Sequence, residues 1–146
     1  MQITTSRFGE VEIQVDDIIL FPNGLAGFED RRHWVILSDE DNEAVAWLQC
    51  VSHPEIAVPV ISPRRFVPEY RLRVSRSQLT PLQIDAVDQA YILGVVSRSD
   101  DKLTLNLRAP LIINLDRRVG RQVVTIDEQP VKYELAGVTS PLRKSA

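Results

Sequence analysis

The sequence has few of the residues that usually carry metal binding or catalysis. Its 146 residues include one cysteine, Cys50, and two histidines, His33 and His53. A single cysteine cannot form an internal disulfide, which fits a reducing compartment. Cys50 and His53 could supply two zinc ligands, whereas a closed structural zinc site needs four. These shortages predict a chain without a bound metal and without a cofactor, in which Cys50 packs in the core and His53 begins a turn.

Long apolar runs and a leader peptide are also missing. No run of 18 apolar residues, the length expected of a membrane-spanning helix, occurs in the sequence. Residues 1–5 lack the basic and apolar regions of a signal peptide. Together with the single cysteine, these observations predict a cytoplasmic protein with no membrane partner.

Catalytic signatures are absent as well. The sequence has no GxSxG nucleophile elbow, and its glycine pair lacks the GK[ST] ending of a phosphate loop. The carboxylates at 39–43 lack the EF-hand pattern, so a solvated acidic loop is favoured there over a calcium site. We therefore expect a binding protein rather than an enzyme.

The chain also lacks a positive excess, since its formal net charge is −3. This argues against bulk attraction to nucleic acid, because neutralising phosphates requires a basic face. An acidic chain is better suited to a basic protein partner. Arginines do cluster locally, at 64–65, 71–76 and 117–121, and are interleaved with Phe66 and Tyr70. They are typical of the wet face of edge strands, and a small β-barrel that binds RNA directly through them is the alternative.

Alternation of apolar and polar residues with a period of two dominates the sequence and predicts a mainly β protein. Many short strands with little helix favour a small, antiparallel, β-barrel-like single domain, with a sandwich as the alternative. We expect this domain to cover residues 1–137 and a loose tail to cover 138–146. The expected strands are 11–15, 35–37, 44–50, 56–61, 70–74, 91–96, 103–107, 111–113 and 123–126.

One short helix is predicted after Thr80, which can serve as an N-cap. Pro81 would be its first residue and Gln83 the return partner of a capping box, with the helix ending by Asp88. A second helical turn is expected near residues 29–33. Residues 97–101 are typical of a hairpin loop, and Pro59 is expected at a strand edge or bulge.

The segment from 21 to 29 is the most distinctive motif. Gly24 and Gly27 allow backbone conformations with positive φ, and no catalytic group occurs in the segment. We interpret it as a shaped loop held by an aromatic residue at each end; the alternative is that these aromatics are core plugs. Its candidate binding residues are Phe21, Pro22, Gly24, Leu25, Gly27 and Phe28.

A second candidate segment follows the alternating leucines at 103–107. If these leucines point inward, Asn106 and Arg108 lie on the wet face, and the Ala109–Pro110 pair ends or bulges the strand. Asn106, Arg108 and Pro110 are therefore candidate surface residues.

These two segments, with Trp47-Leu48-Gln49 between them, resemble the FliW family of flagellar assembly factors. The motifs are FPxGLxGFE at 21–29 and LNLRAPLIIN at 105–114, the latter followed by RxGRQVV at 118–124. The similarity covers residues 1–137, with Ala26 standing where the family usually has proline.

The resemblance implies a cytoplasmic, non-enzymatic regulator with a small β-barrel-like fold. It also implies two rival partners: flagellin, and the basic, RNA-binding translational repressor CsrA. Binding of CsrA would relieve repression of flagellin synthesis, and flagellin would displace it. The acidic residues that would contact CsrA are Asp39, Glu40, Asp41 and Glu43.

Overall fold

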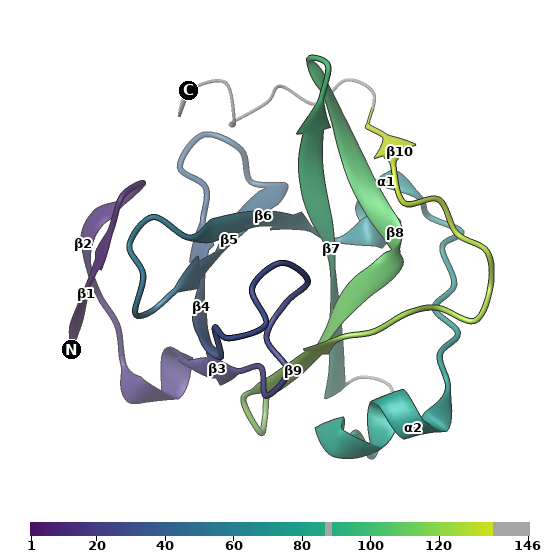
Figure 1. Cartoon of the computed structure of the whole chain (residues 1–146), viewed down its shortest axis with the longest axis horizontal. Coiled ribbons are helices and arrows are strands. Elements are labelled where there is room, and N and C mark those ends of the chain that lie inside the picture. The colour runs from purple at the N-terminus through teal and green to yellow at the C-terminus, as the bar shows by residue number, and fades with distance from the viewer. Residues whose placement is uncertain (87–88, 136–146) are drawn as a thin grey trace.

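The computed structural model describes residues 1–86 and 89–135, and its chain is mainly β (Figure 1). The strands are β1 (Gln2–Thr5), β2 (Gly9–Glu12), β3 (Ile19–Leu20), β4 (His33–Ser38), β5 (Val45–Cys50), β6 (Ala57–Ile61), β7 (Ala90–Ser99), β8 (Lys102–Asn114), β9 (Val119–Gln122) and β10 (Tyr133–Glu134). The helical segments are η1 (Val15–Asp17), α1 (Pro63–Phe66), α2 (Arg76–Leu79) and η2 (Thr80–Leu82).

The main sheet closes on itself. Its order is β10-β8-β7-β6-β5-β4-β3-β9, and an additional β8–β9 pairing joins the ends into the ring seen in Figure 1. β10 adds to the outer edge of β8. All described pairs are antiparallel except β3 with β9, which are parallel at Leu20 and Val119. The closed ring confirms the barrel-like class and leaves no room for the sandwich.

Buried side chains from several strands build the core inside this ring. Trp34 on β4 and Leu48 on β5 have no exposed surface, and Phe21 joins them from the loop between β3 and β4. Leu105 and Leu107 on β8 are buried in a second cluster, together with Trp47 and Tyr70. Thr104 is buried as well, so the wet face predicted for this strand is not exposed at that position. Cys50 packs in the same core as Trp34.

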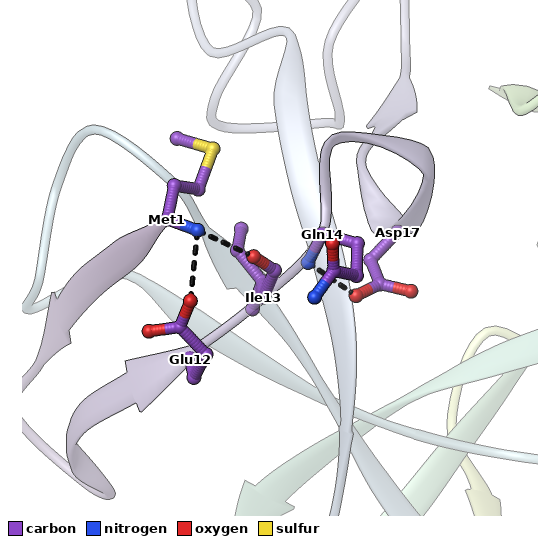
Figure 2. A network of polar contacts seen from close by, with 5 residues as sticks. All are labelled: Met1, Glu12, Ile13, Gln14 and Asp17. Carbon is purple, nitrogen blue, oxygen red and sulfur yellow. Dashed lines mark hydrogen bonds and ion pairs between the residues drawn. The ribbon is translucent and has the colours of Figure 1, made fainter.

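β1 and β2 form a separate hairpin beside the ring. Figure 2 shows the amino nitrogen of Met1 donating to Glu12 Oε1 and to the Ile13 carbonyl, both at 2.9 Å. The next turn is capped where the Gln14 N–H donates to Asp17 Oδ2 at 2.7 Å. These contacts fix the path from the hairpin into β3.

Both predicted hairpins are present, but residues 97–99 belong to β7, so the loop predicted at 97–101 is shortened to a two-residue turn. β7 and β8 are joined at Asp100 and Asp101, whose φ angles of 49° and 66° are those of a type I′ turn. Residues 39–43 join β4 to β5. Pro59 pairs with Trp47 of β5 on one side, whereas pairing of β6 with β7 begins only at Val60. The missing N–H therefore falls where the sheet opens.

Three predicted strands differ from the structure. Of the strand predicted at 11–15, only residues 11 and 12 belong to β2, and Val15 lies in η1 and is 72% exposed. Residues 70–74 alternate in burial but form no strand ladder; Tyr70 points inward and its hydroxyl donates to the Leu107 carbonyl at 2.6 Å. Residues 123–126, predicted as a strand, follow the end of β9 at Gln122 and are not part of it. The Val123 N–H still donates to the Pro110 carbonyl at 2.9 Å. Alternation reports one buried face, not the presence of a paired neighbour.

The predicted helix is also displaced toward the N-terminus. α2 and η2 span 76–82, and Gln83, at φ 51° and ψ 44°, ends the segment in the left-handed region. The Thr80 hydroxyl donates back to the Arg76 carbonyl at 2.9 Å, so Thr80 is inside the segment and is not its cap. Residues 29–33 contain a turn closed by Arg31 N–H and Phe28 O in place of a helical turn. The predicted helix end near 88, the boundary at 137 and the tail lie outside the described residues or at their limit.

Candidate protein-binding groove at the barrel mouth

The loop between β3 and β4 lies across the opening of the ring (Figure 1). Phe21 anchors its start and is fully buried, while its N–H donates to the Arg32 carbonyl at 2.7 Å. Gly24 has φ +65°, and a Cβ there would lie 2.6 Å from the Glu29 carbonyl oxygen. Only glycine fits this position without moving the backbone. The core-plug interpretation is thus correct for Phe21.

A tight turn at the tip of the loop presents its partly exposed residues. Phe28 N–H donates to the Leu25 carbonyl at 2.7 Å, and Gly27 provides the positive φ of 87° at the turn. Leu25 is 4% exposed, whereas Phe28 is half-buried with its ring edge-on to Trp34, 6.1 Å between centroids. Pro22 is exposed at the base of the loop.

The second motif forms a bulge in β8. In the register, Val95 faces Asn106 and Leu93 faces Leu111, so residues 107–110 lie opposite Gly94 alone. The Asn106 side-chain oxygen accepts the N–H groups of Arg108 and Ala109, both at 3.0 Å, and so holds the bulge in shape. Asn106 is therefore structural as well as half-exposed. Arg108 is exposed, as predicted, whereas Pro110 is buried and is therefore not a surface residue.

Gln122 connects the loop to the bulge. Its Oε1 accepts the Ala26 N–H at 2.8 Å, and its Nε2 donates to the Ala109 carbonyl at 3.0 Å. The sequence motif contains Gln122, but nothing in the local pattern signals this role, because its partner Ala26 is 96 residues away. A proline in place of Ala26 would have no N–H to donate here.

The loop, the bulge and Gln122 border a cavity of about 390 Å³, which we call the mouth groove. Apolar side chains line much of it, and a few polar groups converge at its edge. Its lining includes Phe28, Val58, Val95, Ser97, Thr104, Asn106 and Gln122. Such a mixture of apolar walls and few polar groups is typical of binding sites.

Not all predicted site residues reach the mouth groove. Leu25, Phe28 and Asn106 line it, and Gly24 and Gly27 shape the loop that does. The remaining candidates do not line it: Phe21, Pro22, Arg108, Pro110, Asp39, Glu40, Asp41 and Glu43. The acidic loop is thus a separate surface.

Asp39 has a structural task in the acidic loop. Its Oδ1 accepts the Trp47 indole N–H at 2.9 Å, and its Oδ2 accepts the Asn42 N–H at 3.0 Å. The Arg7 guanidinium stacks 3.5 Å from the Trp47 ring centroid. Burial lowers the pKa of Arg7, and the Asp39 carboxylate acts in the opposite direction. Asp39 holds the loop, whereas Glu40 is exposed to solvent.

Glu43 and Asp41 complete the acidic loop. The Glu43 carboxylate is 89% exposed and lies 3.2 Å from Arg65 in a surface ion pair. Such a pair contributes at most about 1 kcal/mol, so it can be exchanged for a partner's charge. Asp41 is exposed, and its N–H donates to Asp39. The exposed carboxylates of this loop are therefore those of Glu40, Asp41 and Glu43.

The metal-like spacing at 50–53 builds a turn. Cys50 Sγ is buried and 3.9 Å from His53 Nδ1, which hydrogen-bonds Ser52 Oγ at 2.9 Å. Gln49 donates its amide to the carbonyls of residues that form this turn, including Cys50 at 3.1 Å and Ile56 at 3.1 Å. Among residues 1–86 and 89–135, no group of three His, Cys, Asp or Glu side chains could hold a metal ion.

Of the two aromatics of the possible RNA-binding strip, Tyr70 is not available for base stacking. Tyr70 is 4% exposed, and burial raises its pKa to about 12. Phe66 is partly buried and packs against the same core cluster.

Among the described helices, none is long and apolar enough to cross a membrane.

Comparisons with known proteins agree on one family. The model of the FliW protein family matches residues 2–135. The flagellar assembly factor FliW of Bdellovibrio bacteriovorus is 40% identical over 129 residues, which cover 87% of this chain and 74% of that protein. FliW of Thermoanaerobacter pseudethanolicus is 35% identical, covering 92% and 93%. A crystal structure of the flagellar assembly factor FliW superposes with a TM-score of 0.84 at 30% identity, covering 92% of this chain and 96% of that one.

Proposed function

The chain belongs to the FliW family, and from this we propose that it is a cytoplasmic, non-enzymatic flagellar assembly factor with two rival protein partners. It binds newly made flagellin in a chaperone-like way. Alternatively, it binds CsrA and prevents that repressor from blocking flagellin translation. Each partner excludes the other.

The observation that carries this proposal is the meeting of the two family-like motifs at one groove. The loop at 21–29 and the bulge at 106–110 are far apart in the sequence, yet Gln122 joins them beside the mouth groove. Neither motif offers a nucleophile or a general base, so a binding role suits the site better than catalysis. The relatives are likewise named assembly factors.

The mouth groove suits an apolar segment of flagellin. Phe28, Val58 and Val95 form apolar lining, and Asn106 and Gln122 can orient a bound backbone. A disordered, amphipathic chain end can become ordered in such a groove when it binds.

The acidic loop suits basic CsrA. Glu40, Asp41 and Glu43 are exposed and carry the same sign of charge. Opposite charge on the partner would speed the encounter and favour the correct orientation. Mutual exclusion then means that each partner raises the apparent dissociation constant of the other by the same factor.

The experiment is a fluorescence-anisotropy binding assay with purified flagellin and CsrA. Ser97→Arg, an exposed change in the groove lining, should weaken flagellin binding at least about tenfold by filling the groove. Ser38→Arg, an exposed serine outside the groove lining, is the matched control. Failure of the wild-type chain to bind either protein would refute the proposed function.

A further inference from the structure

A second surface combines exposed apolar side chains with exposed arginines. The chain after β9 continues as an extended segment in which Val123 and Thr125 are buried while Val124 and Ile126 are 51% and 61% exposed. β-Branched side chains this exposed, two residues apart on one face, are candidates for contact with a partner.

Backbone hydrogen bonds place this segment against residues 73–78. Ile126 N–H donates to the Arg73 carbonyl at 2.7 Å. Gln78 brackets Val124: its Oε1 accepts the Val124 N–H at 2.8 Å and its Nε2 donates to the Val124 carbonyl at 3.0 Å. Figure 1 shows the two segments on the same side of the ring, next to α2.

The neighbouring segment brings positive charge to the two apolar side chains. Arg71, Arg73 and Arg76 are all exposed. Arg73 is paired with Asp127 at 3.0 Å, but its side chain is still 65% exposed. In the part of the chain that the structure describes, Arg71 and Arg76 have no carboxylate partner. We call this surface the basic patch: Arg71, Arg73, Arg76, Val124 and Ile126.

Several features favour a protein partner over nucleic acid. Binding of single-stranded nucleic acid relies on exposed aromatic rings on which bases stack. Tyr70, the nearest aromatic along the sequence, points inward and donates to the Leu107 carbonyl at 2.6 Å. Val124 and Ile126 offer instead the aliphatic surface that a protein side chain would cover.

We propose that the basic patch docks an acidic, amphipathic helix of a partner protein. Val124 and Ile126 are about 6.7 Å apart along an extended chain. Leucines at i and i+4 of a helix are about 6 Å apart, so two of them match this spacing. Carboxylates flanking those leucines would face Arg71, Arg73 and Arg76. None of these residues lines the mouth groove, so this is a second site beyond the function proposed above.

The test measures fluorescence anisotropy of three labelled probes with the whole chain at low and moderate salt. The first probe is a 16-residue amphipathic peptide with leucine at i and i+4 and flanking glutamates. The second has lysine in place of every glutamate, and the third is a single-stranded RNA oligonucleotide. We expect only the glutamate peptide to bind, and more weakly as salt rises.

Variants locate the binding. Two double variants should each weaken binding of the glutamate peptide at least about tenfold: Arg73→Glu/Arg76→Glu and Val124→Ser/Ile126→Ser. Arg117→Glu and Val15→Ser, exposed positions elsewhere, are matched controls and should leave binding unchanged. Circular dichroism verifies folding, and Arg76→Glu alone provides a milder variant.

Three results would overturn the basic patch as a protein-docking site: absence of peptide binding, equal binding by patch variants and controls, or binding of RNA in place of the peptide. No probe is flagellin or CsrA, so these results leave the function proposed above standing.

Discussion

Replacing Gln122 with leucine tests whether one side chain holds the two motifs together at the mouth groove. The change keeps the size of the side chain but removes both hydrogen bonds, from the Ala26 N–H and to the Ala109 carbonyl. Each such bond contributes about 1 kcal/mol net. Because the Ala26 contact is exposed, we expect a total loss of about 1–2 kcal/mol in the free energy of unfolding.

For a chain of this size, that loss corresponds to a decrease in Tm of roughly 3–6 °C. Hydrogen exchange of the Ala26 amide gives a more direct reading. Losing its acceptor should increase local opening about five- to tenfold, since about 1.4 kcal/mol is one factor of ten. The same variant should weaken flagellin binding, because the loop that lines the groove is less well positioned.

Two further variants test the role of the Gln122 side chain. Gln122→Glu keeps the acceptor for Ala26 but loses the donor to Ala109, so exchange at Ala26 should remain slower than in the leucine variant. Gln2→Leu makes the same chemical change at an exposed glutamine on β1, and should alter Tm by less than about 1 °C. The role of Gln122 is refuted if its leucine variant behaves like the Gln2 control in both assays.

The other predictions concern stability, pH and charge. Gly24→Ala should lower the free energy of unfolding, measured with denaturant, by at least about 1 kcal/mol more than Gly9→Ala does. Both glycines have positive φ, but an added Cβ would meet backbone atoms only at Gly24. Equal losses for the two variants would contradict this crowding at Gly24. Tyr70 has a pKa raised to about 12, so its burial stabilises the fold below about pH 10 and this contribution is lost as pH rises toward 12; Tyr70→Phe should remove that alkaline decline in Tm, and an unchanged decline would argue against it. Glu40→Lys should weaken CsrA binding more at 50 mM than at 300 mM salt, whereas Glu69→Lys, another exposed glutamate, should not; a salt-independent effect would exclude the acidic loop.

Local patterns predicted the fold where one strand's neighbours follow it closely in sequence. The alternation at 103–107 and the polar loop at 97–101 correctly indicated the β7–β8 hairpin, because the turn residues and both strands are contiguous. Residues 70–74 show equally clear alternation and yet no ladder. Their inward face is real, as the buried Tyr70 shows, but the existence of a pairing neighbour is decided elsewhere in the chain.

The site illustrates the same limit. Gly24 could be singled out because its backbone conformation is a local property, whereas the role of Gln122 depends on partners in a distant loop and in β8. Asp39 is predicted to contact a basic partner, but its carboxylate accepts a hydrogen bond from the Trp47 indole N–H. The capping box predicted at Thr80 was wrong because the helix had already begun at Arg76. A local signal competes with tertiary contacts that only the folded chain contains.

Mutual exclusion of flagellin and CsrA is tested most simply by sedimentation velocity on an equimolar mixture of this chain, flagellin and CsrA at concentrations above both dissociation constants. We expect two separate binary complexes, with the CsrA complex decreasing as flagellin is added. A stable species containing all three proteins would contradict it.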